Sequence, residues 1–215
     1  MKFHSLISFL LLSVAFSGCV SEPEPVRLID PEGYSFTADT LNRSADRGPQ
    51  FNLSESLQEG PMILLWVSTG CYGCHDWTDE FYAGIENGTL SNQSIVSIHR
   101  YASFESRQNL HDVYGSTNNS THPTSWPVLI PNEETPVVDA KTGFKVNGVT
   151  IFEAFENPVT PTLQIVNQQG VVVWTSDEYR PTENSLENVI DIPVSYTHLR
   201  CRRSTLCRSR WSPYH

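Results

Sequence analysis

The chain has 215 residues, with 14 basic and 24 acidic side chains and a formal net charge of −10 at pH 7. Five of the arginines lie in residues 193–215, so the rest of the chain has nine basic residues and a net charge of −15. Such an acidic chain argues against nucleic acid and anionic lipid as binding partners. Residues 48–192 are enough for one domain with a proper hydrophobic core.

The N-terminus is typical of an export signal. Lys2 supplies a positive charge, and residues 6–16 form an apolar run too short to span a bilayer as a mature helix. The run ends in the letters FSGC, which resemble a lipobox, where a signal peptidase cleaves before the cysteine and a lipid is attached to its thiol. We therefore expect a signal peptide over 1–19 with lipidation at Cys19, and a plain signal peptide is the alternative.

Residues 20–47 are rich in Pro and Glu and have no lasting apolar period, which predicts a flexible tether. The domain that follows alternates strands and helices. Residues 61–67 form a continuous apolar run, as in a strand buried on both faces. The further predicted elements are a helix (75–85), a strand (94–101), a helix (103–115) with Ser103 as N-cap and Gly115 just past its end, a hairpin of strands (161–166 and 171–174), and a last helix (182–190) capped by Thr182.

Between residues 116 and 158 the sequence is irregular. It contains an Asn-Gly pair, Asn147-Gly148, inside an alternating apolar run at 144–152. Asn-Gly favours the two-residue turns that join antiparallel strands, so we expect a hairpin there.

Two cysteines, Cys71 and Cys74, directly follow the buried strand, and His75 comes next. Cys-x-x-Cys is the spacing of a dithiol redox centre, whereas Cys-x-x-Cys-His is also the spacing of a covalent c-type haem site. Only a thiolate attacks a disulfide, and the unpaired N–H groups at a helix N-terminus stabilise a thiolate. A cysteine at the start of the 75–85 helix is therefore suited to disulfide exchange.

This order of strand, Cys-x-x-Cys, helix, strand, helix, proline-led hairpin and helix resembles the thioredoxin fold. More narrowly, it resembles the exported, membrane-tethered thiol–disulfide oxidoreductases of the TlpA/ResA type. The residues that carry the resemblance are Trp66, Cys71, Cys74 and the Thr160-Pro161 pair within VTPT. The resemblance implies an α/β, thioredoxin-like three-layer sandwich over residues 48–192, with a central mixed sheet and helices on both faces.

The resemblance also implies roles for individual residues. Cys71 is the expected nucleophile and Cys74 the resolving cysteine. Pro161 is expected as a cis-proline facing the dithiol, with the backbone of Thr160 pairing with a substrate strand. The neighbours of the site are expected to be Trp66, Tyr72, Gly73 and His75.

The implied enzyme needs no cofactor or metal and exchanges disulfides with protein substrates and a redox partner. Its expected location is the outer face of the cytoplasmic membrane, through lipid on Cys19. The family carries an acid in the central strand, six residues before the first cysteine, but Leu65 occupies that position here. Proton transfer to Cys74 must therefore use another group or water.

Two alternatives remain. In the first, Cys71–Cys74 is a static disulfide in a non-catalytic binding module of the same fold. In the second, less favoured one, His75 is the proximal ligand of a c-type haem, with His99, His111 or His122 as distal ligand. The strong strands disfavour haem, since small cytochromes c are mainly helical. A closed zinc site lacks its ligand spacing.

Residues 193–215 change composition abruptly, with five arginines and no acid. The letters VSYTHL and CRSRWSPYH in this stretch resemble in-frame translations of the two ends of a transposon-type sequencing adapter. We therefore expect a non-native tail, so that Cys201 and Cys207 carry no functional meaning and the natural C-terminus is missing. A basic tail that binds an acidic partner is the alternative.

Overall fold

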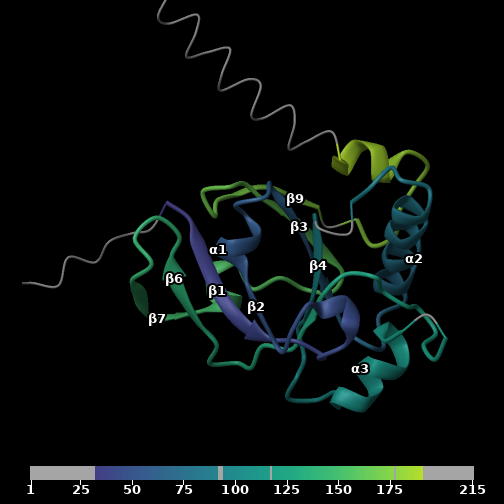
Figure 1. Cartoon of the computed structure of the whole chain (residues 1–215), viewed down its shortest axis with the longest axis horizontal. Coiled ribbons are helices and arrows are strands. Elements are labelled where there is room, and N and C mark those ends of the chain that lie inside the picture. The colour runs from purple at the N-terminus through teal and green to yellow at the C-terminus, as the bar shows by residue number, and fades with distance from the viewer. Residues whose placement is uncertain (1–31, 92–93, 117, 177, 191–215) are drawn as a thin grey trace, which may run out of the picture. The chain divides into compact units, whose positions relative to one another are not determined.

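The computed structural model describes residues 32–91, 94–116, 118–176 and 178–190. A mixed sheet in the order β5-β4-β3-β8-β9 lies at the centre of this part of the chain (Figure 1). β3 pairs in parallel with β4 and antiparallel with β8, so it is central. The strands of this sheet are β3 (Met62–Val67), β4 (Ile95–His99), β5 (Val128–Leu129), β8 (Thr162–Val166) and β9 (Val172–Ser176).

Every residue of β3 is buried, because side chains on both faces of the strand enter a core. Ile63, Leu65 and Val67 belong to the core on the helical side, whereas Leu64 and Trp66 belong to the core on the other side. Alternate side chains of a strand point to opposite faces, so a strand between two cores is apolar throughout. The prediction of a buried strand is confirmed.

Three helical segments cover the first face of the sheet: α2 (Tyr72–Glu86), α3 (Arg107–Tyr114) and residues 185–190. α2 buries Trp77 and Phe81 against the sheet, with their ring centroids 5.6 Å apart. The predicted start of α3 was wrong. Ser106 rather than Ser103 is its N-cap, and the Ser106 hydroxyl accepts the Asn109 N–H at 3.1 Å.

The other face is covered by a second sheet, in the order β2-β1-β6-β7, together with the one-turn helices α1 (Leu53–Ser56) and α4 (Ile151–Ala154). Its strands are β1 (Tyr34–Asp39), β2 (Gln50–Asn52), β6 (Pro136–Asp139) and β7 (Lys145–Thr150). The predicted α/β class, with a central mixed sheet and helices on both faces, is confirmed. The four-stranded second sheet was not predicted.

Two sequence predictions about this second sheet were wrong. Part of the predicted tether is folded: β1 lies within residues 20–47 and buries Phe36, and the rest of that range up to residue 31 lies outside the described residues. The Asn147-Gly148 pair lies inside β7 rather than at a hairpin turn. The hairpin is formed by β6 and β7, and the positive φ of Gly148 (73°) falls where their register shifts, which is typical of a bulge.

A buried ion pair, Arg43–Asp46, connects the segment that was predicted to be a tether to the core. Arg43 precedes a short 3-10 helix (Ser44–Asp46), and its Nη2 lies 2.6 Å from Asp46 Oδ1. The side chains are 7% and 0% exposed. Asp46 also accepts the Val128 N–H at 3.0 Å. The guanidinium donates further to the carbonyl oxygens of Tyr114, Gly115, Thr124 and Trp126.

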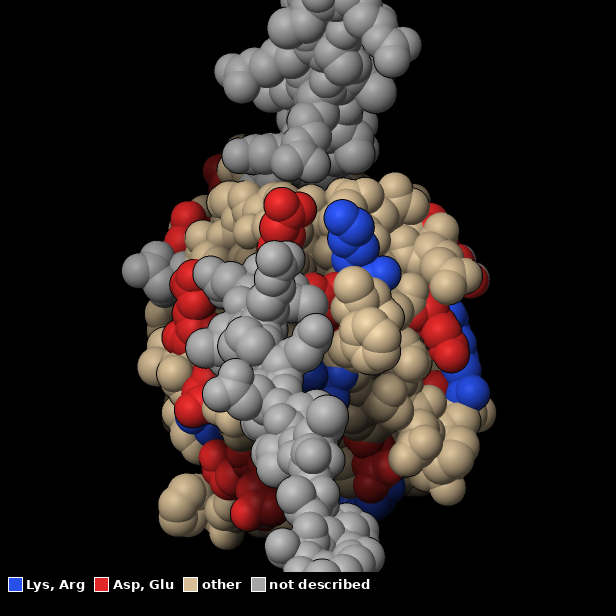
Figure 2. All heavy atoms as spheres, turned by 90° about the vertical axis from the view of Figure 1, so that its left-hand side faces the viewer, with Lys and Arg blue, Asp and Glu red and all other residues tan. Residues whose placement is uncertain are grey.

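The surface bears more acidic than basic side chains. Figure 2 shows Asp and Glu spread over the side of the molecule that carries β6 and β7, with fewer Lys and Arg between them. In the part of the chain that the structure describes, we find no helix with the length and apolar character needed to cross a membrane. The predicted signal peptide, Cys19 and the tail at 193–215 lie outside the described residues.

Candidate active site

The two cysteines lie at the N-terminus of α2 and are joined by a disulfide. Cys71 is the N-cap, and its Sγ accepts the N–H of Cys74 at 3.1 Å. Cys71 is 7% exposed, whereas Cys74 is fully buried. The partial positive charge of the helix end therefore acts on the more exposed of the two cysteines.

The pair between the cysteines, Tyr72-Gly73, is explained by its surroundings. Tyr72 is 70% exposed. A Cβ on Gly73 would overlap the main-chain carbonyl of Tyr179, because residues 178–180 pass directly over the first turn of α2. This segment is held there by the Trp77 indole, which donates to the Glu178 carbonyl at 3.0 Å. Only glycine permits this approach.

The loop between β3 and Cys71 is held by three side chains from different elements. The Tyr114 hydroxyl donates to the Ser68 carbonyl at 2.8 Å. The Thr69 N–H donates to Glu105 Oε2 at 2.8 Å, and the Thr69 carbonyl lies 3.0 Å from His75 Nε2. Since a carbonyl only accepts, His75 carries a proton on Nε2. These bonds fix the backbone immediately before the first sulfur.

The Thr160–Pro161 peptide bond is cis, as predicted. The Thr160 hydroxyl lies 3.2 Å from the hydroxyl of Ser68, three residues before Cys71. Residues 158–161 therefore border the loop that leads to the dithiol. Contact between Pro161 and the sulfurs stays a prediction.

His75 is half-buried, and its ring stacks on that of His122 with centroids 4.1 Å apart. His122 Nδ1 lies 3.0 Å from both carboxylate oxygens of Asp79. Burial, followed by the neighbouring His122, lowers the pKa of His75. The neutral form of His75 is therefore favoured, with its Nε2–H directed at the Thr69 carbonyl.

His99 and Glu105 form a second titratable pair beside the loop, which sequence reasoning missed. His99 is the last residue of β4, and its Nε2 lies 2.7 Å from Glu105 Oε2. Burial lowers the pKa of His99, and the bond to Glu105 offsets this only in part. Burial alone would raise the pKa of Glu105, but hydrogen bonds from Thr69 and His99 hold it below its usual value.

These shifts predict that the protein loses stability as the pH falls. The pKa of His99 and of His75 is lower in the folded state than the usual value of about 6.5, so the unfolded chain binds protons more readily below that pH. Glu105, with its lowered pKa, adds to the loss below about pH 4.5. We expect a lower thermal midpoint at pH 5.5 than at pH 7.5, and a smaller drop in His99→Gln. An equal drop in the variant would contradict the assignment.

The structure places the remaining predicted neighbours differently. The Trp66 side chain lies in the core on the far face of β3, where its Nε1 donates to Gln164 Oε1 at 2.8 Å. Only its carbonyl oxygen approaches the site, 3.9 Å from Cys74 Sγ. Leu65 points to the dithiol side and is fully buried. The sequence named His99 only as a possible distal haem ligand, and nothing in it indicated the pairing with Glu105, because that pairing depends on the turn at residues 101–105.

The site does not fit the haem alternative. A proximal His75 would need a free imidazole nitrogen facing the haem, but its Nε2 is bonded to Thr69 and its ring face is covered by His122. A thioether at Cys74 would need an exposed sulfur, and Cys74 is fully buried. Among the described residues, no group of three or more His, Cys, Asp or Glu side chains is arranged to hold a metal ion.

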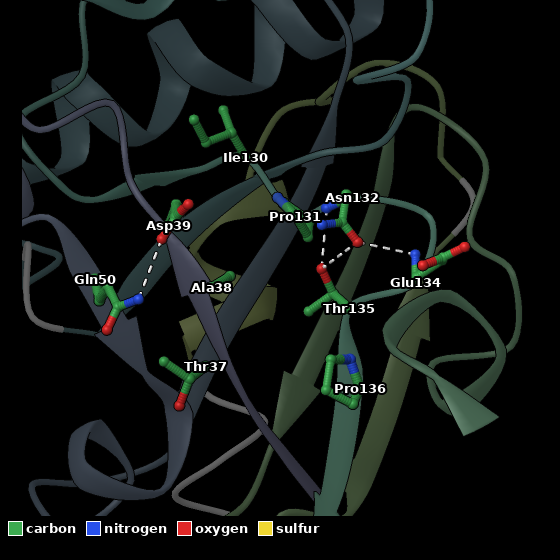
Figure 3. Close-up of a pocket in the computed structure, with 10 residues that line it drawn as sticks. All are labelled: Thr37, Ala38, Asp39, Gln50, Ile130, Pro131, Asn132, Glu134, Thr135 and Pro136. Carbon is green, nitrogen blue, oxygen red and sulfur yellow. Dashed lines mark hydrogen bonds between the residues drawn. The ribbon is translucent and has the colours of Figure 1, made fainter. Parts of the chain in front are cut away.

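A pocket of about 310 Å³ lies apart from these residues, between the β1–β2 pair and the segment 130–136 (Figure 3). Its polar groups largely satisfy one another. Asn132 Oδ1 accepts the Thr135 hydroxyl and the Glu134 N–H, and Gln50 Nε2 donates to Asp39. None of its lining residues belongs to the dithiol site.

No protein-family model and no curated protein sequence matches the chain. Among solved structures, it is similar to a secreted disulfide oxidoreductase of Mycobacterium tuberculosis (17% identity, 71% of this chain and 92% of that chain covered, TM-score 0.45). It is also similar to a thiol-disulfide oxidoreductase of Bacteroides fragilis (12% identity, 75% of this chain and 98% of that chain covered, TM-score 0.48). A third similar structure is an exposed lipoprotein thioredoxin of Streptococcus pneumoniae (14% identity, 73% of this chain and 98% of that chain covered, TM-score 0.47). These similarities are too distant to assign a role to any residue.

Proposed function

We propose that the protein is a thiol–disulfide oxidoreductase that uses Cys71 and Cys74. One observation carries the proposal: Cys71, the more exposed of the two cysteines, caps the N-terminus of the fifteen-residue helix α2, while Cys74 is fully buried one turn further on. A helix N-terminus lowers the pKa of a thiol and so supplies the thiolate needed for exchange.

The reaction runs in two balanced steps. In the reduced enzyme, the Cys71 thiolate attacks one sulfur of a substrate disulfide. A mixed disulfide forms, and the other substrate sulfur leaves as a thiolate. Cys74 then loses its proton and attacks Cys71 Sγ, which releases the second substrate thiolate and closes the Cys71–Cys74 disulfide. Two electrons pass to the substrate, whose thiolates take up two protons, and the reverse sequence oxidises a substrate dithiol.

The segment beside the dithiol favours extended polypeptides as substrates. Within the described residues, the main-chain N–H and C=O groups of Val159 and Thr160 form no hydrogen bond, and the Val159 side chain is 63% exposed. Unpaired main-chain groups beside the site can hydrogen-bond to the backbone of an extended substrate chain. Protein disulfides, and a redox partner that resets the dithiol, are therefore the proposed partners.

A redox titration tests the proposal. Equilibrated with a glutathione or dithiothreitol series, the folded protein should interconvert between disulfide and dithiol in a two-electron transition, and it should reduce insulin in the presence of dithiothreitol. A disulfide that neither titrates in the folded protein nor reduces insulin would instead identify a static disulfide in a binding module.

We also propose that the domain is exported and tethered to the outer face of the cytoplasmic membrane through lipid on Cys19. The support is the apolar run at 6–16 followed by FSGC. In a bacterial host with lipoprotein-processing enzymes, Cys19→Ala should shift the protein from the detergent phase to the aqueous phase, because the acceptor thiol is lost. Unchanged partitioning would leave only a plain signal peptide.

A further inference from the structure

The segment that borders the dithiol is anchored by a side chain from the neighbouring strand. Arg100 directly follows β4, and its main-chain N–H donates to the Val67 carbonyl at 2.9 Å. Its side-chain Nε donates to the carbonyl of Pro158 at 3.2 Å. One residue thus ties the end of β3, just before the Cys71 loop, to the start of segment 158–161.

The guanidinium is held in a fixed position. The Arg100 side chain is 18% exposed, and the central carbon of the guanidinium lies 4.1 Å from the ring centroid of Phe152. Phe152 in turn packs against Trp66, with centroids 6.0 Å apart. Glu133 is a weaker partner, because its carboxylate is 3.9 Å from Arg100 Nη1 and half exposed. The Phe152 ring, the Pro158 carbonyl and the Tyr101 ring, whose centroid lies 5.4 Å from the guanidinium carbon, therefore hold the guanidinium in place.

Segment 158–161 is buried at its two end residues and accessible to solvent at Val159. Pro158 and Pro161 are buried, whereas Val159 is exposed and the Thr160 hydroxyl contacts Ser68. We infer that Arg100 is a positioning residue that holds this segment in the conformation that receives a polypeptide substrate. The inference rests on the proposed function and identifies a residue that acts on substrate binding without touching the sulfurs.

The anchor acts by reducing the entropy lost on binding. A segment that is already ordered binds a partner more tightly than one that must be ordered at that moment. The binding of a protein disulfide that pairs with Val159 and Thr160 depends on segment 158–161 being ordered. A small disulfide such as glutathione disulfide needs only access to Cys71, so its reaction does not depend on the ordering of this segment.

The test compares Arg100→Lys and Arg100→Met with the matched control Glu133→Gln. Lysine keeps the positive charge but has neither the Nε–H nor the planar face, and methionine keeps only the apolar stem. With a protein disulfide as substrate, we expect both variants to raise KM by about tenfold, which corresponds to a loss of ~1.4 kcal/mol in binding free energy. With glutathione disulfide, kcat/KM should stay unchanged, and Glu133→Gln should behave as the wild type on both substrates.

NMR relaxation gives a second readout. The order parameters of the main-chain amides of Val159 and Thr160 should be lower in the Arg100 variants, while those of α2 stay unchanged. If Arg100→Met does not fold, Arg100→Lys decides. Equal losses on both substrates in a folded variant, or no change on either, would overturn the inference. A wild type inactive on both substrates would instead reject the proposed function itself.

Discussion

Cys71→Ser is expected to abolish disulfide exchange. The substituted hydroxyl is not ionised at neutral pH, so the helix N-terminus no longer carries a nucleophile. Cys74 cannot replace it, because that sulfur is fully buried under the first turn of α2, whereas Cys71 is 7% exposed. We expect insulin reduction at the rate of the uncatalysed reaction with dithiothreitol.

Cys74→Ser should give a different result, because it removes only the second step. Cys71 still attacks a substrate disulfide, but no thiolate is left to release the product. A mixed disulfide should accumulate, visible on a non-reducing gel or as an adduct by mass spectrometry, and dithiothreitol should reverse it.

The comparison needs one control. Cys201 and Cys207 in residues 193–215 are further thiols, so both are replaced by serine in every protein compared. The protein with only these two changes should keep full activity. Equal residual activity in the Cys71 and Cys74 variants would reject the assignment of nucleophile and resolving cysteine.

Arg43→Met is expected to produce the largest loss of stability. Removing the guanidinium leaves the fully buried Asp46 carboxylate without its cation and removes the donors to several main-chain carbonyls. Breaking a buried ion pair in this way costs about 3–5 kcal/mol in the free energy of unfolding. Urea titration should show a lower midpoint with an unchanged slope, which distinguishes lost stability from a changed unfolded state.

Arg47→Met is the matched control, because Arg47 is exposed four residues along the same segment. It should change the free energy of unfolding by no more than about 0.5 kcal/mol. The double variant Arg43→Met/Asp46→Leu should recover part of the loss, since no buried charge then remains unpaired. Equal effects of Arg43→Met and Arg47→Met would show that the buried pair does not hold the N-terminal segment.

The sequence by itself determined the local features of the dithiol. A continuous apolar run predicted β3, since a strand between two cores must be apolar on both faces. The helix predicted over 75–85 lies within α2, and the two cysteines lie at the start of α2. The β8–β9 hairpin followed from a short stretch of sequence, whereas the cis bond before Pro161 was expected from the family resemblance. The strand, the helix and the hairpin each depend on residues close together in the chain.

Only the tertiary structure decided which distant residues surround those features. From the sequence, Arg43 belongs to a predicted polar tether. In the structure, its guanidinium donates to main-chain carbonyls within residues 114–126. Glu105 reaches Thr69 only because the turn after β4 directs it there, and Arg100 reaches Pro158 across 58 residues. The need for glycine at position 73 is apparent only in the structure, where the main-chain carbonyl of Tyr179 leaves no room for a Cβ. Buried polar groups need partners wherever the fold brings them, and sequence periodicity carries no information about partners so far apart.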